Sequence, residues 1–312
     1  MPISILVTEP DYFTRVSLRA MREVGDVEAR RMTRRELLRA VRDIDALVVR
    51  IDTRVDAELL RRARRLQCVV SATTGLNHID VAFLKAHDVP LFSLSGAHSV
   101  PTAEHALALL FAIARRIPWA HAHVMRGRWD RWEFIGEEIE GKTLGVVGIG
   151  RIGAEITRRA RALGMRVYAH DPYVSSRAVA ARGARKAGWK TLLSRSDFIS
   201  LHLPLTLETK HMIGKKEFAV MKPSVILINT ARGAIIEEHA FLNALKNKRI
   251  YAAALDVYPE EPLAPSSAFR HYARNHTNLI LTPHIAASTA EAVDRASMFA
   301  ADVIKRFFSS RR

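Results

Sequence analysis

Three residues with complementary chemistry, Arg232, Glu261 and His284, each follow a short apolar run in the second half of the chain. These runs, which we expect to be strands, are 225–229, 251–255 and 279–281. Ligands of open α/β sheets bind beyond the carboxyl ends of the strands, so we expect the three side chains at one binding edge. An arginine binds a carboxylate through two hydrogen bonds, and a histidine can donate a proton near neutral pH. A glutamate hydrogen-bonded to that histidine orients the ring and favours its protonated form.

Each residue also has an ordinary structural interpretation. Arg232 could be a surface charge at a helix start, Glu261 a loop carboxylate before a proline, and His284 a loop histidine. The set becomes more specific beside a nicotinamide site, because hydride transfer to a 2-keto acid requires a carboxylate-binding cation, a proton donor and a group that orients the donor. We therefore interpret the three residues as a candidate catalytic set.

The segment 144–163 has the pattern of a dinucleotide-binding turn. An apolar run ends in Gly148, Gly150 and Gly153, spaced G-x-G-x-x-G, and apolar residues at helical spacing follow. In such a turn the first glycine permits a tight bend, the second lets a pyrophosphate approach the backbone, and the third lets helix and strand pack closely. The helix N-terminus then offers unpaired N–H groups and a partial positive charge to the phosphates.

An acidic residue at the expected distance supports this interpretation. Asp171 follows the predicted strand 166–170 and lies 18 residues after Gly153. A carboxylate there can accept hydrogen bonds from both ribose hydroxyls of NAD, and it would repel the 2′-phosphate of NADP. The alternative, a plain βαβ crossover whose glycines serve only packing, does not explain Asp171. The sequence therefore predicts NAD as the cofactor.

Composition is typical of a globular protein, and 312 residues favour two domains. The chain has a single cysteine, Cys68, and this count excludes a disulfide framework and a cysteine-built metal site. Cys68 lies in the apolar run 66–70, so we expect it to be a buried apolar residue, and we expect no metal. The N-terminus begins directly as a strand, without the basic segment or cleavage site of a signal peptide. No apolar run approaches the roughly 20 residues of a membrane span. We expect a cytoplasmic protein with no membrane partner.

The formal net charge of +16 raises the question of nucleic-acid binding. The arginines are dispersed, and most stand at helical spacing beside apolar residues, as on solvated helix faces. The sequence contains no recognition module and no basic stretch with interleaved aromatic residues. We expect no specific nucleic-acid partner, and we interpret the charge as a general attraction for an anionic substrate and cofactor.

Strands and helices alternate throughout, which predicts parallel sheets covered by helices on both faces. In the first 98 residues we expect strands at 3–8, 27–31, 46–51, 66–72 and 90–94 and helices at 11–24, 34–42, 55–64 and 81–87. In the second half we expect strands near 144–148, 166–170, 198–202, 225–229, 251–255 and 279–281. A final helix at 289–308 is expected to return to the first domain.

A long helix is expected to bridge the two halves, capped by Ser99 and with Pro101 in its first turn. The segment after it, 118–140, carries Trp119, Trp129 and Trp132 and fits no helix or strand pattern. Two interpretations remain open for this segment. It could be an arm that packs on a partner subunit, or a surface loop folded on its own domain.

Five segments, in the same order along the chain, resemble those of the D-isomer-specific 2-hydroxyacid dehydrogenases. They are the glycine turn at 141–153, LHLPLT at 201–206, NTARG at 229–233, ALDV with PEEP between 254 and 262, and TPH at 282–284. The resemblance covers nearly the whole chain. It implies an NAD-dependent interconversion of a small D-2-hydroxy acid and its 2-keto acid. The candidate pairs are 3-phosphoglycerate with phosphohydroxypyruvate, and the hydroxy acids of glyoxylate or hydroxypyruvate.

The resemblance also implies roles for individual residues. Arg232 is implied to bind substrate, and Glu261 and His284 to form the acid–base pair. The implied cofactor contacts are Gly148, Gly150, Arg151, Ile152, Gly153, Asp171, Pro204, Thr209, Thr230, Ala231, Asp256, which would hold the nicotinamide carboxamide, and Thr102. The implied substrate contacts are the backbone at Thr74 and Gly75, with Arg50 and Arg232 as cations.

Two doubly wound parallel-sheet domains are implied: a flavodoxin-like substrate domain at 1–98 plus 286–312, and a Rossmann NAD-binding domain at 99–285. Members of the family pair as homodimers through the bridging helix and its arm, here 101–140, which favours the partner-arm interpretation. Only 28 residues follow His284, so we expect no regulatory C-terminal domain. Two positions depart from the common pattern, Asn77 where an acid is usual and Ala286–Ala287 in place of Gly-Gly.

A different class of function also fits the resemblance. NAD(H)-sensing corepressors keep the same catalytic set but have little or no turnover. They usually carry extra interaction tails, whereas this chain ends close to its last predicted helix. We therefore expect the enzyme, with a corepressor-like binding protein as the alternative.

Overall fold

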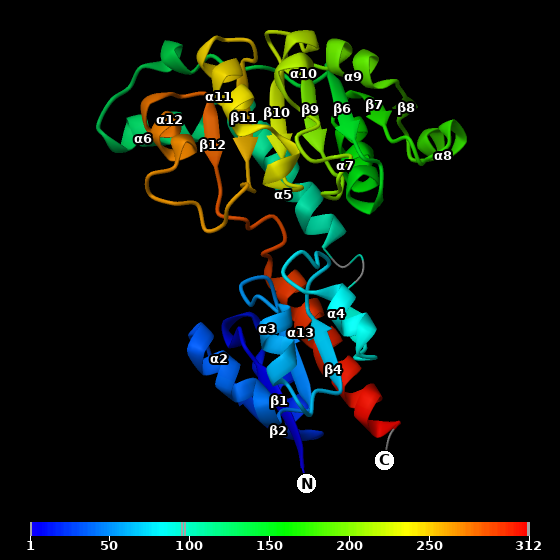
Figure 1. Ribbon diagram of the computed structural model, residues 1–312. Helices are drawn as coiled ribbons and strands as arrows, with labels where there is room; N and C mark the ends of the chain where they lie inside the picture. The colour runs from blue at the N-terminus through cyan, green and yellow to red at the C-terminus, as the bar shows by residue number, and fades with distance from the viewer. Residues whose placement is uncertain (1, 95, 97, 311–312) are drawn as a thin grey trace. The chain divides into compact units, whose positions relative to one another are not determined.

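The computed structural model describes residues 2–94, 96 and 98–310. The chain divides into two compact units, a first unit of Met1–His98 with Ser288–Arg312 and a second unit of Ser99–Ala287 (Figure 1). Each unit is built around one parallel sheet. The second crossing between the units follows residue 287, whereas we expected it after residue 285.

The first unit is a five-stranded sheet with helices on both faces. Its strands are β1 (Ile3–Val7), β2 (Gly25–Ala29), β3 (Ala46–Val49), β4 (Cys68–Ser71) and β5 (Leu91–Ser93). Its helices are α1 (Arg15–Arg22), α2 (Arg34–Ala40), α3 (Ala57–Arg62), α4 (Val81–Ala86) and α13 (Ala290–Ser309), with short 3-10 turns η1 (Pro10–Tyr12) and η2 (Val41–Asp43). The strand order β2-β1-β3-β4-β5 is the flavodoxin-like order, so the predicted fold of this unit is confirmed.

Two apolar layers hold these helices to the sheet. One packs α1 and α13 against β1, β3 and β4, and the other packs α2, α3 and α4 against the opposite face. All residues of β3 and β4 are buried, as expected for parallel strands covered on both sides. The final helix was predicted correctly: Thr289 caps α13 by accepting the N–H of Ala292 at 3.2 Å, and the helix packs on the first sheet.

The helix expected at 11–24 was wrong in its first part. The chain there forms the 3-10 turn η1, becomes extended at Phe13, and starts α1 only after Thr14. The Thr14 hydroxyl accepts the N–H of Ser17 at 3.2 Å, so Thr14 acts as a helix cap rather than as a helical residue. In the same way Asp56 and Asp80 cap α3 and α4.

The second unit is a seven-stranded parallel sheet. Its strands are β6 (Thr143–Val147), β7 (Arg166–His170), β8 (Arg185–Lys186), β9 (Phe198–Leu201), β10 (Ile226–Asn229), β11 (Ala252–Leu255) and β12 (Leu279–Leu281). The order β12-β11-β10-β9-β6-β7-β8 is the Rossmann order extended by one strand, which confirms the second predicted fold. The short edge strand β8 was not predicted. The chain reverses direction across the sheet between β6 and β9, where ligands of such sheets bind.

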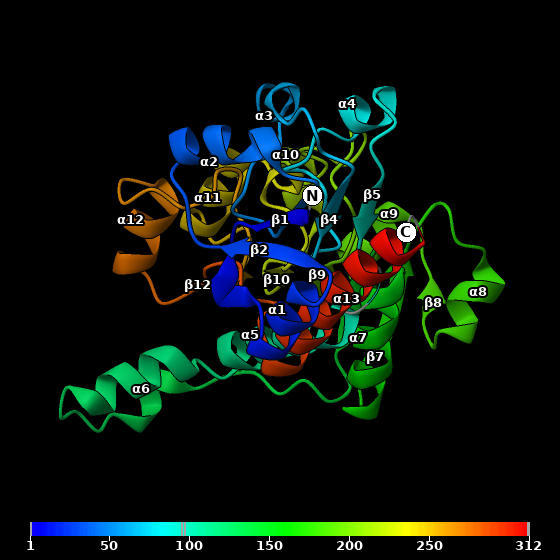
Figure 2. The same ribbon diagram turned by 90° about the horizontal axis from the view of Figure 1, so that it is seen from below.

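Helices cover both faces of this sheet (Figures 1 and 2). One face carries α5 (Ser99–Ala114), α7 (Arg151–Ala162) and α8 (Ser176–Ala181). The other carries α9 (Trp189–Arg195), α10 (Lys215–Val220), α11 (Glu238–Lys246) and α12 (Ala268–Asn275), with the 3-10 turn η4 (Gly233–Ile235) after β10. The bridging helix α5 is confirmed, but Ser99 is its first residue and not its cap.

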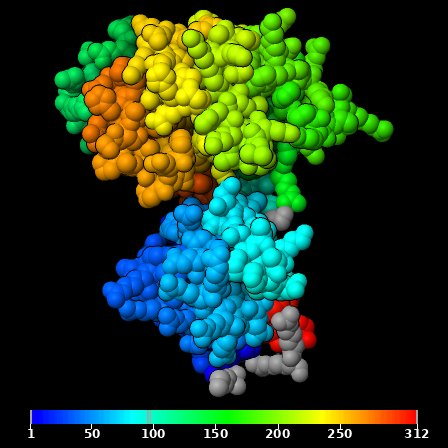
Figure 3. Space-filling model, viewed as in Figure 1, coloured from blue at the N-terminus to red at the C-terminus, as the bar shows by residue number. Residues whose placement is uncertain are grey.

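The segment expected to lack regular structure contains a helix, α6 (Ile117–Met125), and a 3-10 turn, η3 (Arg131–Phe134). Pro118 lies in the first turn of α6, where the backbone N–H that a proline lacks would have no partner within the helix. His123 is buried under the segment and accepts the N–H of Asp130 at 3.2 Å. This arm, which we define as residues 117–135, projects from the body of the second unit (Figure 2), and part of it is visible at the upper left of the space-filling view (Figure 3).

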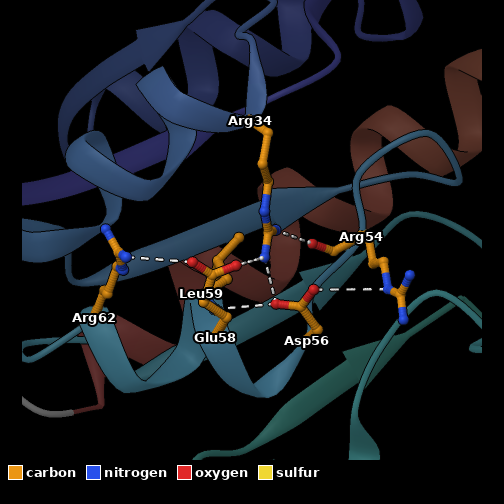
Figure 4. Close-up of polar contacts among 6 residues, drawn as sticks. All are labelled: Arg34, Arg54, Asp56, Glu58, Leu59 and Arg62. Atoms are coloured by element: carbon orange, nitrogen blue, oxygen red, sulfur yellow. Dashed lines mark hydrogen bonds and ion pairs between the residues drawn. The ribbon is translucent and has the colours of Figure 1, made fainter.

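An ionic network joins α2 to α3 in the first unit (Figure 4). The guanidinium of Arg34 donates to Oδ1 of Asp56 at 2.5 Å and to Oε2 of Glu58 at 3.1 Å. Asp56 also accepts the N–H of Leu59 at 3.1 Å as the cap of α3. Burial alone would raise the pKa of Asp56, but the hydrogen bonds from Arg34 and Leu59 outweigh it and hold that pKa below its usual value.

Replacing Asp56 with alanine should lower the free energy of unfolding by about 1 kcal/mol, because the cap is lost. Asp56→Asn, the matched control, keeps a capping oxygen and removes only the charge. Because the folded pKa is lowered, the contribution of the charge is present above the unfolded value of about 3.9 and is lost as the pH falls through the folded pKa. Urea unfolding should show the wild-type advantage over Asp56→Asn at pH 6 shrinking toward about pH 3. A constant difference would contradict the assignment.

Candidate active site

The glycine turn connects β6 to α7 and is shaped by close backbone contacts. Gly148 has a φ of +85°, and a Cβ there would lie 2.4 Å from the carbonyl oxygen of His202 at the end of β9. A Cβ on Gly153 would lie 2.1 Å from the carbonyl oxygen of Gly148. These two glycines are therefore required by the fold itself. Gly150 differs, because no atom of the described residues comes within 4 Å of the place its Cβ would take.

Gly150 is also the residue before the first turn of α7, a helix of 12 residues, and it offers no side chain to cap that turn. Arg151 is exposed, and Ile152 packs against the apolar layer of α5 and α7. The first N–H groups of a helix have no partner within the helix and carry a partial positive charge. The open space at Gly150 therefore has the properties of an anion-binding site.

The acidic residue predicted after β7 lies at this turn. Oδ2 of Asp171 accepts the N–H of Ile149, between the first two glycines, at 3.1 Å. Its Oδ1 accepts the N–H of Tyr173 at 3.0 Å. The guanidinium of Arg182, which the sequence did not single out, donates to the carbonyl of Ile149. A carboxylate and a guanidinium thus fix the backbone of the same turn residue.

The loop after β9 lies against Gly148 and contains a buried imidazole. Nε2 of His202 is 2.8 Å from Oγ of Ser200, and its buried Nδ1 has no hydrogen-bond partner in the part of the chain that the structure describes. Burial lowers the pKa of His202 to about 3, so the ring is neutral at physiological pH. Further along, Oγ1 of Thr209 donates to the carbonyl of Pro204 at 2.7 Å, so these two expected cofactor contacts lie together.

Two further expected contacts, Thr230 and Ala231, follow β10. The N–H of Ala231 donates to Oδ1 of Asn229, and Nδ2 of Asn229 donates to the carbonyl of Arg232, each at 3.0 Å. The hydroxyl oxygen of Thr230 is buried and has no hydrogen-bond partner among residues 2–94, 96 and 98–310. An unsatisfied buried hydroxyl costs about 1–3 kcal/mol, so a ligand contact there would be favourable. Thr102 is buried in α5.

The structure brings the residues of the candidate catalytic set together within the second unit. Nδ1 of His284 is 2.6 Å from Oε2 of Glu261, and Oε1 of Glu261 accepts the N–H of Tyr258 at 2.8 Å. A carboxylate only accepts hydrogen bonds, so Nδ1 of His284 carries the hydrogen and Nε2 remains for a ligand. The guanidinium of Arg232 interacts electrostatically with the same Glu261.

Arg232 is a largely buried cation. Its Nη1 donates to the carbonyl of Ala231 at 2.6 Å. A Cβ on Gly233 would lie 2.0 Å from the carbonyl carbon of Tyr258, so the loop of Arg232 packs directly on the loop that carries Glu261. Burial lowers the pKa of Arg232 and the charge of Glu261 partly offsets this, but an arginine stays protonated at neutral pH. The site therefore combines a fixed cation with a carboxylate–imidazole pair.

A fully buried carboxylate, Asp256, follows β11 and organises the loop of His284. Its Oδ1 accepts the hydroxyl of Thr282 at 2.6 Å and the N–H of Ile285 at 2.9 Å, and its Oδ2 accepts the N–H of Ala286 at 2.8 Å. Its carbonyl accepts the N–H of His284 at 2.9 Å. The sequence suggested Asp256 as a cofactor contact, and the structure gives it contacts within the protein that hold the loop.

The residues expected to bind substrate in the first unit lie at the carboxyl ends of the neighbouring strands β3 and β4. Arg50 follows β3 and is only 7% exposed, with its Cζ 4.9 Å from the centroid of the Tyr12 ring. Its Nη1 is buried without a hydrogen-bond partner in the described ranges. Thr74 and Gly75 follow β4, where the Gly75 carbonyl accepts the hydroxyl of Thr73 at 3.0 Å.

Sequence reasoning missed His98, which lies near Arg50. His98 is buried, and its Nε2 has no hydrogen-bond partner within the described residues. Burial, followed by the charges of Arg50 and Arg295, lowers its pKa to about 4. The only signal in the sequence was a histidine just before the bridging helix, which is common at helix starts and carries little information.

Two residues beside the catalytic set were also missed. His105 on α5 places its Nε2 3.4 Å from Oδ1 of Asp256. The hydroxyl of Tyr258 donates to the carbonyl of Thr282 at 2.8 Å and so joins the loops of Glu261 and His284. His105 had one weak signal, because it stands where the polar start of α5 gives way to the apolar run 106–114.

The described residues contain no group of three or more His, Cys, Asp or Glu side chains that could hold a metal ion. None of the helices in the described part of the chain is long and apolar enough to cross a membrane. Cys68 is a buried free thiol in β4.

Comparisons with known proteins agree with this geometry. A family model described as "D-isomer specific 2-hydroxyacid dehydrogenase, NAD binding domain" matches residues 107–286. The chain is 41% identical to D-3-phosphoglycerate dehydrogenase of Archaeoglobus fulgidus, over 97% of this chain and 56% of that protein. It is also 41% identical to glyoxylate reductase of Thermococcus litoralis, over 82% of this chain and 78% of that protein. The chain spans a little over half the length of the phosphoglycerate dehydrogenases it matches.

Among solved structures, D-lactate dehydrogenase from Aquifex aeolicus, complexed with NAD and lactic acid, has a TM-score of 0.88 and 25% sequence identity, and covers 98% of this chain and 96% of its own. The family model, the relatives and the strand order of both sheets agree. The chain therefore belongs to the family of D-isomer specific 2-hydroxyacid dehydrogenases and contains its NAD-binding domain.

Proposed function

We propose that this protein is an NAD-dependent oxidoreductase that interconverts a small D-2-hydroxy acid and its 2-keto acid. The observation that carries the proposal is the 2.6 Å contact between His284 and Glu261, beside the largely buried cation of Arg232. Relatives named D-3-phosphoglycerate dehydrogenase and glyoxylate reductase support two candidate keto acids, phosphohydroxypyruvate and glyoxylate, with hydroxypyruvate as a third.

The second unit fits a dinucleotide at points that its own contacts leave unexplained. Gly150 borders open space at a helix N-terminus, and the hydroxyl of Thr230 is buried with no hydrogen-bond partner among the described residues. Asp171, at the same turn, suits the ribose hydroxyls of NAD and disfavours the 2′-phosphate of NADP. NAD, when bound, supplies or takes up a hydride at its nicotinamide ring.

The side chains of the site provide the remaining chemistry. Arg232 binds the carboxylate of the keto acid through two hydrogen bonds. His284 donates the proton on Nε2 to the oxygen at C2, while Glu261 accepts the hydrogen bond from Nδ1, orients the ring and stabilises its charged form. In the oxidative direction Nε2 accepts the hydroxyl proton, so the same pair acts as the base. To the first unit we assign binding of the anionic groups of the substrate, by Arg50 and the backbone at Thr74 and Gly75.

We also propose a homodimer formed through residues 101–140. The arm exposes large apolar side chains that a monomer would leave in water: Met125 is 72% exposed, Trp129 75%, Trp132 84% and Ile135 66%. Aromatic residues and methionine are enriched in protein interfaces, and a projecting apolar patch of this kind marks an interaction surface. The helix α6, which belongs to the same arm, projects from the body of the second unit (Figure 2).

Gly150→Ala and Gly148→Ala form a matched pair that tests the cofactor site. Gly150→Ala should melt near the wild-type temperature, because its methyl group meets no described atom, but should weaken NADH binding by at least about tenfold, or 1.4 kcal/mol. Gly148→Ala should be destabilised, because its Cβ would meet the His202 carbonyl. Thermal unfolding and NADH fluorescence titration measure the two effects. Unchanged NADH affinity in folded Gly150→Ala would remove the anion site from this turn.

His284→Ala should lower kcat for keto-acid reduction by at least about 100-fold, because the proton donor is lost, while the Kd of NADH stays within about twofold of wild type. His239→Ala, an exposed histidine on α11, is the control and should behave as wild type. The assay uses NADH with glyoxylate, hydroxypyruvate and phosphohydroxypyruvate. Near-normal turnover by His284→Ala would exclude it as the acid. Absence of wild-type turnover on the whole panel would exclude the proposed function.

The double variant Trp129→Ser/Trp132→Ser should be monomeric in sedimentation velocity at concentrations where the wild-type chain is dimeric, because the exposed aromatic surface is removed. Val16→Ser is the control, since Val16 is 65% exposed on α1 and lies outside the arm. A wild-type monomer, or a double variant that remains dimeric, would show that the arm does not form the interface.

A further inference from the structure

The contact between His105 and Asp256 has no role in the function proposed above. Nε2 of His105 lies 3.4 Å from Oδ1 of Asp256 and 3.3 Å from Oγ1 of Thr282. The side chain of His105 is 19% exposed and that of Asp256 is fully buried. His105 follows Glu104 on α5, but the two side chains have different partners: Glu104 pairs with Arg159, and His105 meets the buried carboxylate of Asp256.

Asp256 connects His105 to the backbone on both sides of His284. Its side chain accepts the N–H groups of Ile285 and Ala286, and its carbonyl accepts the N–H of His284. His284 has a φ of +53°, a left-handed conformation that costs a non-glycine residue about 1–3 kcal/mol and persists only where its surroundings impose it. The contacts of Asp256 fix the backbone at His284, Ile285 and Ala286 and so support this conformation.

The charge of Asp256 depends on these partners. Burial alone would raise the pKa of the carboxyl, but the hydrogen bonds from His105, Thr282 and the loop N–H groups lower it below its usual value. Loss of one partner from a fully buried carboxylate is costly, and the remaining groups must shift to compensate. Of these partners, His105 belongs to the helix α5, whereas Thr282 and the N–H groups of Ile285 and Ala286 belong to the loop that carries His284.

We propose that His105 is a positioning residue for His284: through Asp256 it holds the loop 282–286 so that the imidazole of His284 stays hydrogen-bonded to Glu261. This inference rests on the proposed function only in taking His284 as the proton donor. The alternative is that His105 merely satisfies the buried carboxylate. In that case its loss would lower the melting temperature without changing the His284–Glu261 contact or the proton transfer.

A measurement without turnover separates these two roles. In proton NMR of the full chain, the hydrogen between His284 Nδ1 and Glu261 should give a low-field signal, identified by its absence in His284→Gln. His105→Ala should broaden or remove this signal. His105→Gln, whose side-chain amide can reach the place of the imidazole Nε2, should restore it. An unchanged signal in folded His105→Ala would overturn the inference, whether or not the wild-type protein reduces any keto acid.

The kinetic experiment uses the keto acid that the wild-type protein reduces. His105→Ala should lower kcat about 10- to 100-fold, which is less than or equal to the roughly 100-fold minimum expected when the general acid itself is lost, and change the Kd of NADH less than about threefold. The solvent deuterium isotope effect on kcat should rise, because proton transfer becomes slower, and His105→Gln should recover most of the rate. Wild-type kcat and isotope effect in His105→Ala would overturn the proposal, and a parallel loss of NADH binding would assign His105 a merely structural role.

Two further variants keep the experiment decisive. Glu104→Gln alters the neighbouring residue on α5, whose carboxylate pairs with Arg159 at 3.0 Å and not with Asp256. This variant should match the wild type in both the NMR and the kinetic experiment. His105→Asn is polar but too short to reach Asp256, so it carries the same expectations as His105→Ala if the alanine variant fails to fold. If the wild-type protein showed no turnover, the proposed function would be rejected, but the NMR experiment would still decide the role of His105.

Discussion

A negative charge buried at the end of β11 is the constraint on which the candidate site depends. Removing a carboxylate from water costs several kcal/mol unless hydrogen bonds replace its hydration, and Asp256 is fully buried. The replacement comes from a hydroxyl, two loop N–H groups and an imidazole, contributed by α5 and by the chain after β12. Satisfying this one carboxylate therefore draws three separate segments together. The imidazole of His284 reaches Glu261 as a consequence of that packing and not through its own contact alone.

The glycine turn after β6, in the same seven-stranded sheet, is also shaped by one close contact. At the point where the strand order reverses, β6 and β9 are neighbours, and the loop after each strand must pass the other. Gly148 solves this by bringing its backbone against the carbonyl of His202. With that contact closed, Gly150 is left facing open space at the N-terminus of α7. These two glycines of the motif therefore have different roles. Gly148 is required by the packing of the protein itself, whereas Gly150 fits a site for an anion.

Much of this was predictable from the sequence, because the signals were local. Apolar runs identified the strands of both sheets except the short edge strand β8, and the glycine spacing with Asp171 located the turn. The proximity of the candidate catalytic residues was predictable because strand ends of a parallel sheet share an edge. The missed features depend on contacts between distant segments. His105 acquires a role only when α5 packs near β11. In α6, Ile117, Val124 and Met125 are exposed while Trp119 packs against the core, so the apolar residues do not mark one buried face. Thr14 and Asp56 show that a capping side chain moves a helix start where apolar spacing alone would extend it.

Ala286–Ala287 stand where the family pattern commonly has Gly-Gly, and the backbone conformation of the loop explains why alanine fits there. Among the described residues of 282–287, only His284 has a positive φ, so no position after it requires glycine and alanine is accommodated without cost. The N–H of Ala286 still reaches Asp256, and its methyl group is buried, so the substitution adds packing to the loop. The unfavourable conformation is thus confined to the residue that carries the imidazole. A residue held in such a conformation relaxes when its surroundings loosen, so the proposed positioning by the buried carboxylate and its partners acts on His284 through its backbone, while the hydrogen bond to Glu261 acts on its ring.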